Sequence, residues 1–161
     1  MNKRLAVIND VPVLIELRKQ QLIDEGLPPI SNIDMNIDKQ LSDYFTTSIT
    51  DGSFISWVME SDGEIIATSG LCFYTLPPNF SNPTGRTAYV TNIYTKPEHR
   101  RKGIAAELLS MVIDEAKSRG YKVIRLHTSE YGKSIYEKVG FTDTDGYMAL
   151  RLQKQNGGYE K

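Results

Sequence analysis

A basic turn near the middle of the chain carries residues that could bind an anion. Arg100, Arg101 and Lys102 are followed directly by Gly103. The three side chains supply positive charge, and a glycine lets another group approach the backbone closely because it has no Cβ. A helix that begins here would add its free first-turn N–H groups and the positive end of its dipole. These features predict a phosphate or pyrophosphate site, although a basic triplet also fits an ordinary solvated turn.

The flanking segments predict the strand and the helix that position this turn. Residues 89–95 are β-branched or aromatic except for Asn92, which predicts a strand that Pro97 ends. From Gly103 to Ala116 apolar residues recur at three- and four-residue spacing, as on one face of a helix. The turn lacks both the Gly-x-Gly-x-x-Gly pattern of dinucleotide-binding folds and the Lys-Ser/Thr ending of a P-loop.

The remaining pattern predicts the order β-α-α-β-β-β-α-β-α-β. Asp-Gly at 62–63 lies between two strand-like runs and indicates a hairpin. Asp10 is a plausible helix N-cap, Gly26 ends that helix, and residues 74–86 form a long irregular loop. We expect strands at 3–7, 54–59, 64–73, 89–95, 122–128 and 147–152, helices at 10–26, 37–49, 103–116 and 133–139, and an extra short strand near Phe141.

Two motifs resemble those of the GNAT N-acetyltransferases. Residues 100–105, Arg-x-x-Gly-x-Ala, are similar to the family's acyl-CoA signature, Arg/Gln-x-x-Gly-x-Gly/Ala. Residues 135–141, Ile-Tyr-Glu-Lys-Val-Gly-Phe, are similar to its Leu-Tyr-Glu-Lys-Leu-Gly-Phe segment. The resemblance covers roughly residues 4–152. It implies an α/β (α+β) fold of the acyl-CoA N-acyltransferase type, with one GNAT domain at 3–152, a mixed, mostly antiparallel sheet with helices on both faces, and a flexible tail at 153–161.

The resemblance also implies acetyl-CoA as co-substrate and the residues that hold it. In the family the backbone of the central strand pairs with the pantetheine arm, and the N–H groups of the turn hold the pyrophosphate. Many members carry Asn-x-x-Ala upstream of the tyrosine, whereas this chain has Ser-Glu-Tyr-Gly at 129–132, which leaves that contact open. The expected donor-binding residues are Ile93, Tyr94, Thr95, Arg100, Arg101, Lys102, Gly103, Ile104, Ala105, Ser129 and Gly132.

Tyr136 is the expected catalytic residue. A thiol has a reference pKa of about 8.5 and a tyrosine of about 10, so a phenol can donate a proton to a leaving thiolate. The resemblance places the family's general acid here, and a packing aromatic is the alternative. The general base is not identifiable, since the central strand has Thr91 and Asn92 where the family often has Glu. His127 is a candidate base or a hydrogen-bonded sheet residue; a chain of water molecules could also accept the proton, or the amine could arrive already neutral.

Acidic residues dominate positions 20–53, which wall the acceptor site in the family. An acidic wall would attract an ammonium group, whereas the alternative is that these carboxylates cap helices or lie on solvated faces. Only Lys39 opposes Asp24, Glu25, Asp34, Asp38, Asp43 and Asp51. The candidate acceptor residues are Asn92, Asp24, Glu25 and His127.

The composition fits one globular domain. The chain has 161 residues, 40% of them hydrophobic and 24% charged, which is enough to bury a core. A net charge of −1 argues against nucleic acid as the main partner, and no apolar run approaches the length of a membrane span. Cys72, the single cysteine, excludes an intrachain disulfide and is expected in the core. We expect a cytoplasmic protein without a metal, a nucleic-acid partner or a membrane partner, and leave a homodimer open.

Three functions are compatible with these features. The first is acetyl-CoA-dependent N-acetylation of a small-molecule primary amine by direct transfer, with Tyr136 as general acid. The second is acetylation of a protein or peptide amine, which predicts a wide groove in place of a pocket. The third is a non-catalytic acyl-CoA-binding or regulatory domain, which the missing base allows and Tyr136 argues against.

Overall fold

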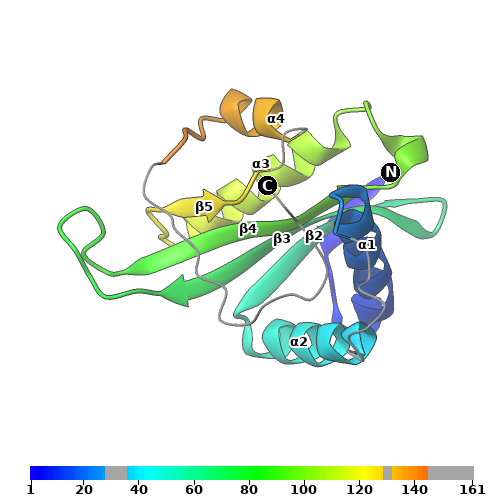
Figure 1. Cartoon of the computed structure of the whole chain (residues 1–161), viewed down its shortest axis with the longest axis horizontal. Coiled ribbons are helices and arrows are strands. Elements are labelled where there is room, and N and C mark those ends of the chain that lie inside the picture. The colour runs from blue at the N-terminus through cyan, green and yellow to red at the C-terminus, as the bar shows by residue number, and fades with distance from the viewer. Residues whose placement is uncertain (28–35, 129–131, 145–161) are drawn as a thin grey trace.

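The strands of the chain form one twisted sheet in which sequence neighbours are also spatial neighbours (Figure 1). The computed structural model describes residues 1–27, 36–128 and 132–144. Within these ranges the strands are β1 (Asn2–Leu5), β2 (Phe54–Ser61), β3 (Glu64–Thr75), β4 (Arg86–Thr95) and β5 (Ile124–Leu126). Consecutive strands pair antiparallel from β1 to β4, whereas β5 pairs parallel to β4 because a helix connects them.

Helices cover both faces of this sheet (Figure 1). α1 (Val11–Asp24) and α2 (Ile37–Asp51) share one core cluster, in which Leu14 and Phe45 pack with Phe54 of β2. α3 (Ile104–Ser118) buries Leu109 and Val112 with apolar residues of β3 and β4. α4 (Lys133–Lys138) follows β5, and short 3₁₀ turns, η1 (Ile8–Asp10) and η2 (Pro97–His99), precede α1 and α3.

The mixed sheet with helices on both faces confirms the fold expected from the sequence. Asp62, with a φ of 53°, and Gly63, with a φ of 82°, form the expected hairpin turn between β2 and β3. The first strand ends at Leu5, earlier than predicted, and β5 is shorter than predicted because its pairing with β4 stops at Leu126.

Two predicted strands have different outcomes. Residues 141–144 contain no strand, so the extra strand expected near Phe141 is not formed in the part that the structure describes. The strand predicted at 147–152 and the tail at 153–161 lie outside the described residues.

No helix in the described part of the chain is both long and apolar enough to cross a membrane.

Candidate active site

A β-bulge in β4 shapes the middle of the sheet. Between the paired positions 70–91 and 68–94, Ser69 of β3 alone faces two residues of β4, Asn92 and Ile93. Asn92 has a φ of 52°, in the left-handed region that asparagine tolerates better than most residues. An extra residue in one strand re-aims the side chains around it, and bulges are frequent beside active sites.

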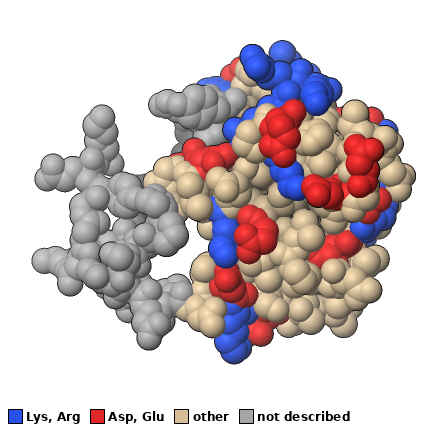
Figure 2. Space-filling view, turned by 90° about the vertical axis from the view of Figure 1, so that its right-hand side faces the viewer, with Lys and Arg blue, Asp and Glu red and all other residues tan. Residues whose placement is uncertain are grey.

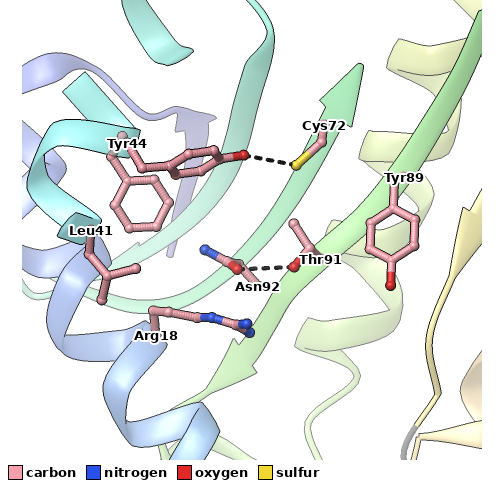
Figure 3. Close-up of a pocket in the computed structure, with 8 residues that line it drawn as sticks. Arg18, Leu41, Tyr44, Cys72, Tyr89, Thr91 and Asn92 are labelled. Carbon is pink, nitrogen blue, oxygen red and sulfur yellow. Dashed lines mark hydrogen bonds between the residues drawn. The ribbon is translucent and has the colours of Figure 1, made fainter. Parts of the chain in front are cut away.

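The bulge opens toward a pocket between α1, α2 and the sheet (Figure 3). The pocket has a volume of about 240 Å³. In a regular strand Thr91 and Asn92 would point to opposite faces, but here both line the pocket, and Thr91 Oγ1 donates to Asn92 Oδ1 at 3.1 Å. The other lining residues are Arg18, Leu41, Tyr44, Phe45, Cys72 and Tyr89.

The thiol in the pocket wall is held in its neutral form. Cys72 is half-buried there, at the edge of the core in which the sequence predicts it, and its Sγ lies 3.1 Å from the Tyr44 hydroxyl. Burial raises the pKa of Cys72, although the Tyr44 hydroxyl and the charge of Arg18 oppose the shift. A thiol that stays protonated is a poor nucleophile, so Cys72 is a lining residue and not a candidate for covalent catalysis.

β4 and β5 separate just beyond the pocket. Their parallel pairing ends where Val90 lies opposite Leu126. From that point to Thr95, β4 has no strand partner on its β5 side among the described residues. The backbone of Ile93–Thr95, expected to bind the donor, lies in this divergent part. His127 follows β5 directly; it is exposed and does not line the pocket.

Tyr136 lies on α4 beside this divergence. Its half-buried ring packs in the α3-side core and meets Phe141 edge-on, with the ring centroids 6.1 Å apart. Burial raises the pKa of Tyr136, and the negative charges of Glu25 and of ionised Tyr89 raise it further. Tyr136 is thus close enough to Glu25 and to the pocket residue Tyr89 for their charges to affect its pKa.

The turn before α3 contains two residues in the left-handed region and leads into an uncapped helix start. Arg101 has a φ of 60° and Gly103 a φ of 80°. Gly103 occupies the N-cap position, no side chain caps the first turn of α3, and a Cβ added to Gly103 would meet nothing within 4 Å. The first turn of α3, whose N–H groups are expected to hold the pyrophosphate, therefore has no side-chain cap, and the space beside Gly103 is open.

Arg100 is engaged by the protein itself. Its Nε donates to the Thr95 carbonyl oxygen at 2.9 Å, its guanidinium forms an ion pair with Asp24, and its Cζ lies 5.3 Å from the centre of the Tyr94 ring. Hydrogen bonds from Arg100 and Gln20 hold the pKa of Asp24 below its usual value. The Asp24 carboxylate is therefore paired with an arginine of the turn, and Asp24 does not line the pocket.

The other described acidic residues of positions 20–53 also have local partners. Asp38 pairs with Lys19, Asp43 pairs with Lys39, and Glu25 accepts a hydrogen bond from Gln21. None of the described residues that line the pocket is acidic. On the face in Figure 2 basic side chains gather at the upper edge, the edge at which Figure 1 places the turn before α3, and acidic and basic side chains alternate below.

Some of the predicted site residues cannot be placed. Asp34 and Ser129 lie outside the described residues, whereas Gly132 occupies the N-cap position of α4. In the described residues no group of three or more His, Cys, Asp or Glu side chains could hold a metal ion.

Sequence reasoning missed three residues of the pocket, Arg18, Tyr44 and Tyr89. Arg18 is four residues after Leu14 and three before Gln21, both of which are buried. That spacing places Arg18 beside the buried face of α1 and is a signal that could have identified it. Tyr44 and Tyr89 have no comparable signal, because the sequence alone does not distinguish an aromatic residue of a pocket wall from one that packs in the core.

Comparison with known proteins agrees with this geometry. A crystal structure of a predicted acetyltransferase with acetyl-CoA from Clostridium acetobutylicum is 40% identical, with a TM-score of 0.88 and coverage of 94% of this chain and 96% of that chain. A GCN5-related N-acetyltransferase from Ralstonia eutropha JMP134 is 25% identical, with a TM-score of 0.82 and coverage of 94% and 99%.

Curated relatives match over a shorter stretch. The thialysine N-epsilon-acetyltransferase of Mus musculus is 27% identical over 100 residues, which cover 58% of this chain and 56% of the relative. The chain thus spans about half the length of the curated relatives that it matches. Residues 21–141, from the end of α1 through α4, match the Acetyltransferase (GNAT) family. The chain belongs to the GNAT family of acetyltransferases.

Proposed function

We propose that this protein is an acetyl-CoA-dependent N-acetyltransferase that transfers the acetyl group directly to the primary amine of a small molecule. The observation that carries the proposal is that one strand joins two sites. β4 runs from Tyr89, Thr91 and Asn92 in the pocket wall to the open turn before α3. Along this path β4 diverges from β5. A donor lying along the divergent part of β4 would present its acyl end to the pocket.

The donor-side residues fit acetyl-CoA, which supplies an acetyl group activated as a thioester. The N–H groups from Arg101 to Ala105 would hold the pyrophosphate, since they lie in an open, uncapped helix start. The backbone of Ile93–Thr95 would pair with the pantetheine arm as an added strand does. The acetyl-CoA in the Clostridium acetobutylicum structure supports this assignment by similarity.

The reaction needs a neutral amine and a proton for the departing sulfur. The amine nitrogen forms a bond to the acetyl carbonyl carbon, the carbon–sulfur bond breaks, and its electron pair goes to sulfur. Tyr136 donates its phenolic proton to that sulfur and regains one from solvent. A phenol with the usual pKa of about 10 is already protonated at neutral pH, and the raised pKa of Tyr136 makes this residue still less suited to act as a base.

The amine proton takes a different route. The described lining of the pocket contains neither a carboxylate nor a histidine. We therefore propose that the nitrogen loses its proton to water in the pocket, along the polar side chains of Thr91 and Asn92.

A pocket of about 240 Å³ favours a small acceptor over a protein, for which a wide groove is expected. The test is to measure the free thiol released from acetyl-CoA with a panel of small primary amines and with peptides that offer an N-terminus or a lysine. We expect turnover with small amines and only background with peptides. Turnover with peptides alone would establish the protein-acetylating alternative. Acetyl-CoA binding without turnover on any amine would make the protein an acyl-CoA-binding domain.

A further inference from the structure

Arg18 places a positive charge in the pocket that the described chain does not neutralise. It extends from α1 toward Thr91 and Asn92 of β4 (Figure 3). Its Nη1 donates to Gln21 Oε1 at 3.1 Å, and no carboxylate within residues 1–27, 36–128 and 132–144 forms an ion pair with it. An arginine side chain is charged at any physiological pH. A half-buried guanidinium beside a cavity is therefore stabilised by an anion that enters the cavity.

Neighbouring cations differ from Arg18 in this respect. Lys19, the next residue on α1, pairs with Glu16 and Asp38, and Arg100 pairs with Asp24. Each of these side chains has an acidic partner supplied by the protein. Arg18 points into the pocket and has no such partner among the described residues. This distinguishes Arg18 from the neighbouring surface cations.

Among the described residues that line the pocket, Arg18 is the only one with a charged side chain. The charge of Arg18 acts across the pocket on Cys72 and Tyr89, where it opposes the rise in pKa that burial causes. Tyr89 of the pocket wall and Glu25, which lies outside the described lining, both contribute to the raised pKa of Tyr136. An acceptor that carries an anion at one end and an amine at the other would place its anion at Arg18 and its amine away from it.

We propose that Arg18 forms an anion subsite and that the acceptor is an aminocarboxylate, whose carboxylate binds Arg18 while its amine points toward Tyr89 and Tyr136. This inference rests on the proposed function and specifies its substrate class. The planar guanidinium matches a carboxylate with two parallel hydrogen bonds. Leu41 and Phe45 contribute apolar surface to the same pocket. Because Arg18 repels an ammonium group, it also disfavours the reversed orientation.

The experiment compares matched acceptors that differ in one charge. A series of ω-amino acids of increasing chain length, each paired with its ω-amino carboxamide, is assayed for thiol release from acetyl-CoA. At the best chain length the carboxylate should exceed its carboxamide in kcat/KM by about tenfold, as expected for a charge-assisted pair. Arg18→Gln should lower the ratio of the carboxylate kcat/KM to the carboxamide kcat/KM to about one, and Arg18→Lys should keep part of the preference. Lys19→Met, one residue away, should keep all of it.

A second measurement keeps the inference testable without turnover. In the presence of CoA, the same ω-amino acid should raise the melting temperature of the wild-type protein and of Lys19→Met, but not of Arg18→Gln. Equal use of carboxylates and carboxamides, or a preference that survives in Arg18→Gln, would overturn the anion subsite even if amines are acetylated. If no amine is acetylated, the melting shifts decide the inference separately from the proposed function. A shift that is the same in Arg18→Gln rejects the inference.

Discussion

Arg100, in the turn before α3, is joined by an ion pair to Asp24, in the last turn of α1. The same arginine donates to the Thr95 carbonyl oxygen at the end of β4. One guanidinium thus connects the expected pyrophosphate turn to the helix that also carries Arg18 of the pocket. Asp24, expected from the sequence to recruit the acceptor, is in the structure the ion-pair partner of Arg100.

Single neutralisations of Asp24 and Glu25 should therefore affect different substrates. Asp24→Asn leaves Arg100 without its partner, and we expect the KM for acetyl-CoA to rise about two- to fivefold, the usual worth of a partly exposed ion pair. Glu25→Gln removes a negative charge near Tyr136, and we expect the KM for a cationic amine to rise by a similar factor, more at low salt than at high salt. Steady-state kinetics with each substrate varied in turn measure both effects.

The outcome separates the two roles of the acidic residues. If both variants raise the acceptor KM and neither changes the donor KM, the acidic residues recruit the amine together, as an acidic wall would. If neither KM changes in either variant, these carboxylates are solvated surface groups, as the sequence also allows.

A second ion pair should make the stability of the protein depend on pH. Arg4 Nη1 lies 2.6 Å from Asp10, which also accepts the Val7 N–H at 2.7 Å. The hydrogen bond from Arg4 lowers the pKa of Asp10 from its usual 3.8. Because the folded-state pKa is the lower one, the stabilisation is fully present above about pH 4 and is lost as the pH falls through the folded-state value.

Asp10→Asn tests this directly. At pH 7 the variant should lose about 1–3 kcal/mol of unfolding free energy, since a mostly buried partner of an arginine is removed. The difference from wild type should shrink as the pH falls below about 4. The matched control is Asp43→Asn, which breaks an exposed pair with Lys39 on α2 and should cost only about 0.3–0.5 kcal/mol. Urea unfolding at several pH values measures both, and a difference independent of pH would contradict the prediction.

The fold could be predicted because its signals are local. The run of β-branched residues at 89–95 and the helical spacing after Gly103 depend only on near neighbours in sequence. The bulge could not be predicted, because it is a property of pairing: Ser69 faces both Asn92 and Ile93 only in the register that the hairpin and β4 adopt together. The pocket wall follows from that register, since the bulge places Thr91 and Asn92 on the same side.

Charge was the least predictable feature of the site. The number of acidic residues at positions 20–53 indicates an acidic region. That number does not reveal that Lys19, Lys39 and Arg100 form ion pairs with three of these carboxylates. In the sequence, Arg18 does not differ from other polar residues of an amphipathic helix. Its role depends on how α1 packs against β4, which requires contacts between residues more than 70 positions apart.

Gly103→Glu should abolish the binding of acetyl-CoA without unfolding the protein. A Cβ at this position meets nothing within 4 Å, so the cost to folding is limited to a left-handed backbone with a φ of 80°. The new carboxylate would lie where the pyrophosphate is expected and would repel it. Ligand at about 100 times its dissociation constant stabilises the wild-type fold by about 2.7 kcal/mol, and the variant should lose this melting shift.

The chain offers a matched control at the other end of α3. Gly120 has a φ of 75° and also has open space around its Cβ position. Gly120→Glu therefore introduces the same side chain with similar backbone strain, but far from the expected donor. It should keep the full acetyl-CoA melting shift. A shift that survives in Gly103→Glu, or disappears equally in Gly120→Glu, would remove the turn from the donor site.

Tyr136→Phe should lower kcat by about 10²–10⁴, the usual contribution of general acid catalysis. The variant keeps the ring that packs against Phe141, so the fold and the affinity for acetyl-CoA should survive. Because the pKa of Tyr136 is raised above 10, the wild-type rate should fall only at higher pH, and that limb should change in the variant. Tyr121→Phe is the control, since Tyr121 stacks on Phe73 and lines no part of the described pocket. A Tyr136→Phe enzyme with the kcat and the high-pH limb of Tyr121→Phe would make Tyr136 a packing residue.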